Sequence, residues 1–182
     1  MREDQIIRYT RQILLQELGG RGQERLLSSP VRVLGAGAAI DDAVAYLLAG
    51  GTPVELAGPP PGGFLWGTQL DALNPDAAPT VPAVLEVVGA GSSSQASMQV
   101  VIGNGVAFRG TSACDECWSL TRAALDELIA PETDLSPLGS LAALIAQRLL
   151  LGWGEGLGLI LWNGERMETA PLRTCQPHSN SQ

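Results

Sequence analysis

The chain has 182 residues, a hydrophobic content of 45% and a formal net charge of −8 at pH 7, which predicts a single domain with a substantial apolar core. Nucleic acid and anionic membranes are excluded as expected partners, because the eleven cationic side chains are scattered arginines and phosphate groups require clustered cations. No stretch is apolar enough to act as an export signal or to span a bilayer. We therefore expect a cytoplasmic protein whose thiols are reduced.

Helical patterns dominate the N-terminal part of the chain. Apolar residues recur at helical spacing from 4 to 18, which predicts an amphipathic helix that ends at Gly19 and Gly20. A short second helix is expected over 23–27. A Ser-Ser-Pro sequence at 28–30 then predicts a break before the first strand.

A strand, a glycine-rich turn, a helix and a second strand follow in that order. The strands are expected over 31–34 and 54–56, and the helix over 38–48. This order is typical of a right-handed βαβ unit with parallel strands. The chain is therefore predicted to have an α/β, Rossmann-like fold of three layers, in which a sheet lies between helices.

The glycine-rich turn bears on nucleotide binding. Gly35 and Gly37 would lie at a helix N-terminus, a position that favours an anion. However, Ile40 stands where the dinucleotide-binding pattern requires a third glycine. Asp41 and Asp42 would lie in the first helical turn, where their carboxylates would repel a phosphate. Gly35 and Gly37 are thus the residues of this turn that fit a cofactor-binding role.

Two helices, one strand and two hairpins are predicted in the rest of the chain, from 67 to 172. Turn-forming residues are frequent in the middle, where a helix over 67–73 and a strand near 84–88 are predicted. Two Asn-Gly sequences lie between apolar runs and predict hairpins over 100–108 and 159–172. A helix is expected over 137–151. Its predicted apolar face comprises Leu141, Leu144, Ile145 and Leu149.

All the cysteines and the one histidine of the chain fall into two pairs, Cys114 with Cys117 and Cys175 with His178. Two such pairs are typical of a closed zinc site with four protein ligands, which leaves no position for catalytic water. Each predicted hairpin leads to one pair, so we expect both pairs to meet at one metal. In the alternative interpretation, the cysteines are small buried hydrophobic residues and His178 lies in a disordered tail.

Several short motifs follow one another along the chain in the order found in a known protein family. They are an Arg-Tyr-Thr-Arg-Gln sequence at 8–12, a Gly-Arg-Gly-Gln-Glu-Arg-Leu sequence at 20–26, the turn at 35–37, a Leu-Asp-Ala-Leu-Asn-Pro sequence at 70–75, the two metal pairs and a Pro-Leu-Gly-Ser-Leu sequence at 137–141. In these motifs the chain resembles the ThiF/MoeB/HesA family, relatives of the ubiquitin-activating enzymes. In that family the last metal pair is usually two cysteines, and His178 is a chemically acceptable replacement for one of them.

The resemblance implies an activity and a domain organisation. Family members use magnesium ATP to adenylate the C-terminal glycine of a ubiquitin-like sulfur-carrier protein, and they usually work as dimers. The resemblance implies one ThiF/MoeB-like domain over 1–182. Within it, 1–30 would be a helical dimerisation segment, 31–111 a shortened Rossmann-like part, and 112–182 a zinc knuckle with a C-terminal helix and hairpin.

The residues that adenylation requires are largely missing from the matching positions. Ala57-Gly58-Pro59 stands where the family has a ribose-binding carboxylate, the chain contains no lysine to contact phosphate, and 91–95 replaces the segment that carries a magnesium-linked aspartate. The crossover loop, expected over 121–136, contains no reactive cysteine. We therefore expect neither ATP nor magnesium to act in this chain.

One functional residue of the family is retained. The second arginine of the motif at 8–12 reaches the ATP phosphates of the partner subunit in the family, and Arg11 matches it. The chain is thus interpreted as a non-catalytic subunit that forms a heterodimer with a full-length homologue and donates Arg11 to it. A homodimer is the other assembly that the resemblance allows. In the alternative, Arg8 and Arg11 pair with surface carboxylates such as Glu3 or Glu17.

Two other functions stay open. One is a zinc-stabilised module that binds a peptide or a ubiquitin-like sulfur-carrier protein. The other is a divergent ATP-dependent adenylating enzyme with rearranged residues, for which the candidates are Arg32, Arg109, Asp41 and Asp42.

Overall fold

The structure is a computed structural model, which describes residues 1–57, 83, 85–89, 96–128, 135–153, 156–162, 164–172 and 175. The predicted helix over 67–73 and the predicted ligand His178 lie outside the described residues. Within the described part of the chain, no helix is both long and apolar enough to cross a membrane.

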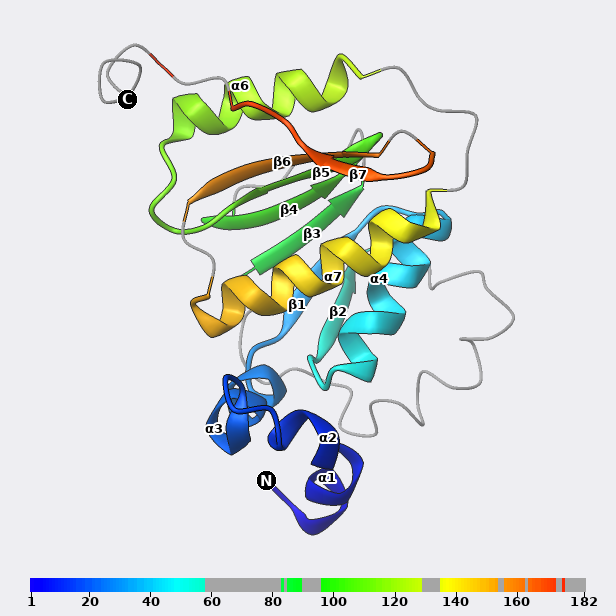
Figure 1. Cartoon of the computed structure of the whole chain (residues 1–182), viewed down its shortest axis with the longest axis vertical. Coiled ribbons are helices and arrows are strands. Elements are labelled where there is room, and N and C mark those ends of the chain that lie inside the picture. Colours follow the sequence, from blue (N-terminus) through cyan, green and yellow to red (C-terminus); the bar gives the residue numbers. More distant parts are fainter. Residues whose placement is uncertain are drawn as a thin grey trace.

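A seven-stranded mixed sheet forms the centre of the molecule (Figure 1). Its strands are β1 (Val31–Leu34), β2 (Val54–Ala57), β3 (Leu85–Gly89), β4 (Met98–Ile102), β5 (Gly105–Arg109), β6 (Leu157–Trp162) and β7 (Met167–Thr169). They lie in the order β2-β1-β3-β4-β5-β6-β7. Strands β1 to β4 are parallel, whereas β5, β6 and β7 each pair antiparallel with the preceding strand. The predicted parallel βαβ unit and both predicted hairpins are confirmed.

Helices cover both faces of the sheet and extend beyond one end of it (Figure 1). They are α1 (Glu3–Arg8), α2 (Thr10–Ile13), α3 (Gly19–Leu27), α4 (Ala38–Ala49), α6 (Asp115–Asp126) and α7 (Ser136–Leu151). Helices α4 and α7 pack on one face and α6 on the other, while α1 to α3 lie at the end of the sheet. This arrangement confirms the predicted three-layer, Rossmann-like α/β class.

The core is divided by the sheet into two clusters. The larger cluster lies between the sheet and helices α4 and α7, where Val31, Leu85 and Val100 are fully buried. The smaller one lies under α6 and includes Val88 and Val101. Valines on adjacent positions of one strand thus contribute to opposite faces, because side chains alternate along a strand.

The N-terminal helices differ from the prediction of one helix over 4–18. Helix α1 ends at Arg8, and Tyr9 is buried with only 4% of its surface exposed. The Thr10 hydroxyl donates hydrogen bonds to the carbonyls of Ile6 and Ile7 at 2.8 and 2.9 Å, a side-chain interaction that bends helices. Gly19, which was expected to end a helix, instead begins α3 in a left-handed conformation with φ of 59°.

Two further predictions are corrected in the C-terminal part. The first cysteine pair was expected in a knuckle turn and 121–136 in a crossover loop, but α6 occupies 115–126. Acidic residues in its first turn and a buried stripe of Trp118, Thr121 and Leu125 are typical of a helix. In α7, Leu144 is 55% exposed rather than buried, because small residues such as Ala142 and Ala146 form the contact face instead.

Candidate functional site

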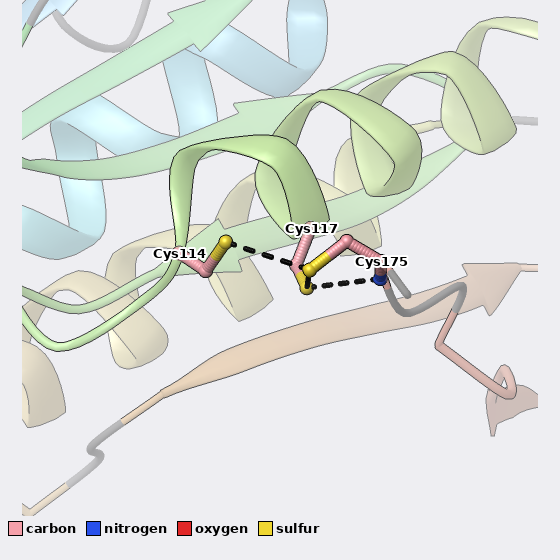
Figure 2. A group of neighbouring side chains, drawn as sticks. All are labelled: Cys114, Cys117 and Cys175. Atoms are coloured by element: carbon pink, nitrogen blue, oxygen red, sulfur yellow. Dashed lines mark hydrogen bonds between the residues drawn. The ribbon is translucent and has the colours of Figure 1, made fainter. Parts of the chain in front are cut away.

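Three of the four predicted metal ligands meet in one cluster (Figure 2). Cys114 is the N-cap of α6, Cys117 lies in the first turn of that helix, and Cys175 lies in the segment after β7. The Sγ atoms of Cys114 and Cys175 are 3.8 Å apart, and those of Cys117 and Cys175 are 3.4 Å apart. All three sulfur atoms lie within 4.8 Å of one another.

The spacing of the sulfur atoms fits a metal site rather than a disulfide. A disulfide holds its sulfurs at about 2.05 Å. Two thiolates on one tetrahedral zinc ion, each at about 2.3 Å from the metal, lie roughly 3.8 Å from each other. The observed separations of 3.4 and 3.8 Å are close to that value. Three soft donors at this spacing can hold a metal ion, with zinc as the ion that this donor set favours.

Backbone N–H groups favour the thiolate form of Cys114, which is the form that a metal requires. The pKa of the Cys114 thiol is lowered below its usual value of 9.0, chiefly because the backbone N–H of Cys117 donates to it, with a smaller contribution from the N–H of Glu116. Partial burial of the thiol opposes this shift. The backbone N–H of Cys175 points at the Sγ of Cys117 at 3.4 Å. Since thiolates are the metal ligands, these N–H groups support binding.

The glycine-rich turn lines a cavity of about 570 Å³ at the carboxyl ends of β1 and β3. Gly35 and Gly37 have φ values of 120° and 111°, a left-handed region in which glycine is favoured. A Cβ on Gly35 would lie 3.2 Å from the Cα of Gly89, so the two backbones approach closely. Ligands of open α/β sheets bind at this position. The described lining comprises Gly35, Ala36, Gly37, Ala38, Ala39, Ile40, Gly89, Ile102, Gly103, Asn104, Asp126 and Leu135.

The charge of this cavity is unfavourable for a phosphate. Among the described residues that line it, Asp126 is the one with a charged side chain. Asp41 and Asp42, both half-buried on α4, are not among the described lining residues. A phosphate in the described part of the cavity would therefore meet a carboxylate and no guanidinium.

The arginines proposed for a rearranged active site lie elsewhere. Arg32 on β1 is 3.7 Å from carboxylate oxygens of both Glu55 and Glu86 on the neighbouring strands. Arg109 pairs with Asp115 beside the cysteine cluster. The structure therefore does not bring Arg32 and Arg109 together at the cavity.

Arg11 lies on α2 with an exposed side chain. Within the described part of the chain it forms no hydrogen bond or ion pair, so pairing with Glu3 or Glu17 is not observed there. The guanidinium of Arg8 lies over the ring of Tyr9, 5.7 Å from its centroid. Arg11 is thus available to an external anion.

Exposed apolar side chains precede and follow Arg11 in the chain. Ile7 is 70% exposed, Leu14 77% and Leu15 55%. Leu15 also lines a groove of about 710 Å³ between α2, α3 and the C-terminal half of α7, a feature with no counterpart among the sequence predictions. The groove is lined by Gln12, Leu15, Glu17, Leu18, Gln23, Leu26, Gly50, Leu144, Gln147, Arg148, Leu151 and Trp153. We call the exposed side chains of Ile6, Ile7 and Leu14 together with this groove the N-terminal apolar face.

No protein-family model and no curated protein matches the sequence. Solved structures nevertheless share its fold. E. coli MccB is similar with a TM-score of 0.56 at 14% sequence identity, over 91% of this chain and 69% of MccB. PaaA is similar with a TM-score of 0.53 at 12% identity, over 93% of this chain and 84% of PaaA. Both are ThiF/MoeB-like adenylyltransferases, and at these identities the likeness is one of fold.

Complexes are known among these neighbours. MccB has been solved with ATP, with a TM-score of 0.55 at 14% identity over 91% of this chain and 71% of that one. The microcin C7 biosynthetic enzyme MccB has also been solved with N-formylated MccA, with a TM-score of 0.55 at 12% identity over 91% of this chain and 72% of that one.

Proposed function

We propose that this chain is a non-catalytic subunit of ThiF/MoeB-like fold, which binds a full-length, ATP-competent homologue and contributes Arg11 to the phosphate site of that partner. The single observation that carries the proposal is the charge of the glycine-turn cavity. A triphosphate requires cations to neutralise it before a carboxylate can attack. The described lining offers the carboxylate of Asp126 instead.

The N-terminal apolar face supports the second half of the proposal. Contiguous exposed apolar side chains mark interaction sites in proteins, and here the exposed Leu15, Leu144 and Trp153 line one groove. Glu17 and Arg148 also line the groove. A partner would be accommodated if it placed a positive charge opposite Glu17 and a negative charge opposite Arg148.

Arg11 would act through its fixed charge. It lies on the short helix α2, three residues before the exposed Leu14, so docking of the apolar face would bring it to the interface. A guanidinium donates two parallel hydrogen bonds to a phosphate and stays charged at every physiological pH. Arginines supplied by a partner subunit accelerate phosphate chemistry by roughly 10³–10⁵-fold.

The proposal is tested by mixing the chain with a full-length homologue from the same organism and measuring exchange of labelled pyrophosphate into ATP. We expect complex formation and a rate that falls at least about 100-fold with Arg11→Ala. Arg25→Ala is the matched control, because Arg25 is also exposed on an N-terminal helix. Absence of a complex, or equal rates for both variants, would refute the proposal.

We propose a structural role for the metal. Cys114, Cys117 and Cys175 would hold zinc, and His178 would be the fourth ligand. A bound zinc supplies binding free energy that stabilises the folded state. With four protein ligands it would have no open position for substrate or water.

A second candidate function is a module that binds a peptide or a sulfur-carrier protein. The observation in its favour is that the fold neighbour MccB has been solved with MccA. Titration of the isolated chain with a carrier protein or peptide, followed by calorimetry, distinguishes the two functions. Saturable binding without the homologue would favour the binding module.

Calorimetry with ATP addresses the third candidate, an adenylating enzyme with rearranged residues. The proposed subunit is expected to release no heat of binding with magnesium ATP. Tight, magnesium-dependent binding of ATP by the isolated chain would overturn the non-catalytic assignment.

A further inference from the structure

Arg109, the last residue of β5, is a buried cation beside the cysteine cluster, with 9% of its surface exposed. Burial of a guanidinium is costly unless its N–H groups are paired. Its Nη1 donates to Oδ1 of Asp115 at 2.6 Å and its Nη2 to the carbonyl oxygen of Ala96 at 2.8 Å. The buried Nε has no hydrogen-bond partner within the described residues. Two hydrogen bonds thus hold the side chain, and one of them reaches α6.

The contacts of Arg109 fall on the chain neighbours of two metal-ligand candidates. Asp115 directly follows Cys114, and Trp118 directly follows Cys117. The guanidinium carbon of Arg109 lies 5.6 Å from the centroid of the Trp118 ring, within the range of a cation–π interaction. One arginine side chain therefore contacts α6 at a residue adjacent to each of these two cysteines.

Trp118 is held from a second direction. Its indole N–H donates to Oε1 of Gln99 at 3.2 Å, and Nε2 of Gln99 donates to the carbonyl oxygen of Ala96 at 2.7 Å. The Ala96 carbonyl therefore accepts hydrogen bonds from both Gln99 and Arg109. Since Gln99 is 1% exposed, this network is buried, and it joins β4, β5 and the first turn of α6.

The backbone transmits this restraint to the sulfur atoms. The N–H of Trp118 donates to the carbonyl of Cys114 at 2.9 Å, and the Thr121 hydroxyl donates to the carbonyl of Cys117 at 2.8 Å. Asp115 and Trp118 thus fix the first turn of α6. The backbone therefore has little conformational freedom at Cys114, which precedes Asp115, and at Cys117, which precedes Trp118. Side-chain charge contributes less, because the Asp115 side chain is 94% exposed and solvent screens its ion pair.

We propose that Arg109 is a positioning residue for the metal centre, which holds the first turn of α6 so that Cys114 and Cys117 present their sulfurs toward Cys175. The inference rests on the proposed metal site and adds to it a residue that touches no metal. Groups that orient metal ligands typically change metal affinity by about 10–100-fold.

The test is titration of the purified, metal-free chain with cobalt(II), whose thiolate charge-transfer and d–d absorption bands report ligand geometry. Zinc competition then provides the zinc dissociation constant. We expect Arg109→Met to raise both dissociation constants by about 10–100-fold and to shift the d–d bands. Arg109→Lys restores the charge but cannot reach Asp115 and Ala96 together, so it is expected to recover only part of the affinity.

Arg32→Met is the matched control, since Arg32 also pairs with two groups, on strands of the same sheet but away from the cysteines. It is expected to bind cobalt with the wild-type constant. Asp115→Ala is a second test that spares the fold, because the Asp115 side chain is exposed. It removes the oxygen that accepts from Nη1 of Arg109 and is expected to weaken cobalt binding several-fold.

Three results would overturn the inference. They are unchanged dissociation constants and spectra in Arg109→Met, an equal loss of affinity in Arg32→Met, or, if Arg109→Met does not fold, wild-type affinity in Asp115→Ala. A wild-type chain that binds no cobalt would instead refute the metal site itself, which is a different failure.

Discussion

At Gly139 the backbone of α7 meets the first turn of α4 with no space for a side chain. A Cβ at this position would overlap the carbonyl oxygen of Ala39 and would lie 2.9 Å from the Cβ of Asp42. Asp42, a candidate for ATP chemistry from the sequence, thus lies at a helix–helix contact. The close approach explains why small residues are needed where α4 and α7 cross.

Gly139→Ala is predicted to destabilise the chain by about 1–3 kcal/mol through overpacking, although alanine is favoured over glycine in a helix by about 1 kcal/mol. Urea denaturation measures the change. Gly20→Ala is the control, because its Cβ would meet only the Cε of Met1, at 3.8 Å. If both variants are equally stable, the contact between the helices is looser than described.

Helix α7 serves two surfaces at once. One side packs on α4 and on the sheet through residues such as Leu138, Ala142 and Leu149. The other side contributes Leu144 and Leu151 to the groove of the N-terminal apolar face. A helix that is apolar on both sides is expected to be buried on both. One side of α7 is buried by α4 and the sheet, and the proposed partner subunit would bury the other.

Leu144→Glu is predicted to weaken binding of the proposed homologue by at least about 10-fold, because a carboxylate in the apolar groove loses hydration without a partner. The fold is expected to change in stability by less than about 0.5 kcal/mol, since the side chain is largely exposed. Analytical ultracentrifugation measures the complex. Tyr46→Glu is the control, because Tyr46 is 56% exposed on α4 and is not among the described lining residues.

In the whole molecule the cysteine cluster joins segments that are distant in the chain. Cys175 meets residues 61 and 58 positions earlier, Cys114 and Cys117. The metal would thereby connect α6 to the segment that follows the edge strand β7. An ion that binds only the folded state stabilises it by mass action.

Removal of zinc by a chelator is predicted to lower Tm by on the order of 10 °C, which corresponds to about 4 kcal/mol for zinc at a thousand times its Kd. Differential scanning calorimetry measures the shift. The Tm of Cys117→Ser is expected to be low already and to be unaffected by the chelator. An equal fall in both proteins would contradict a metal held by Cys117.

Local patterns in the sequence predicted most of the described elements. The strands β1 and β3, the helices α4 and α7 and both hairpins follow from short apolar runs, glycines and Asn-Gly turns, whose effects are local. Helix α6 does not follow from the cysteine spacing, because a Cys-x-x-Cys pair also fits a knuckle turn. Its acidic first turn and the spacing of Trp118 and Leu125 contain the signal for a helix.

Residue type and short spacing along the chain were enough to predict the α/β class, most of the described elements and the cysteines that would bind a metal. The folded structure was needed to show that Arg109 contacts Asp115 and Trp118, the residues that follow Cys114 and Cys117, and does not line the glycine-turn cavity as far as it is described. It also decided that Leu144 faces a groove and not the core. Such contacts depend on the angle and position at which whole elements pack against one another, and the spacing of residues within one element does not encode them.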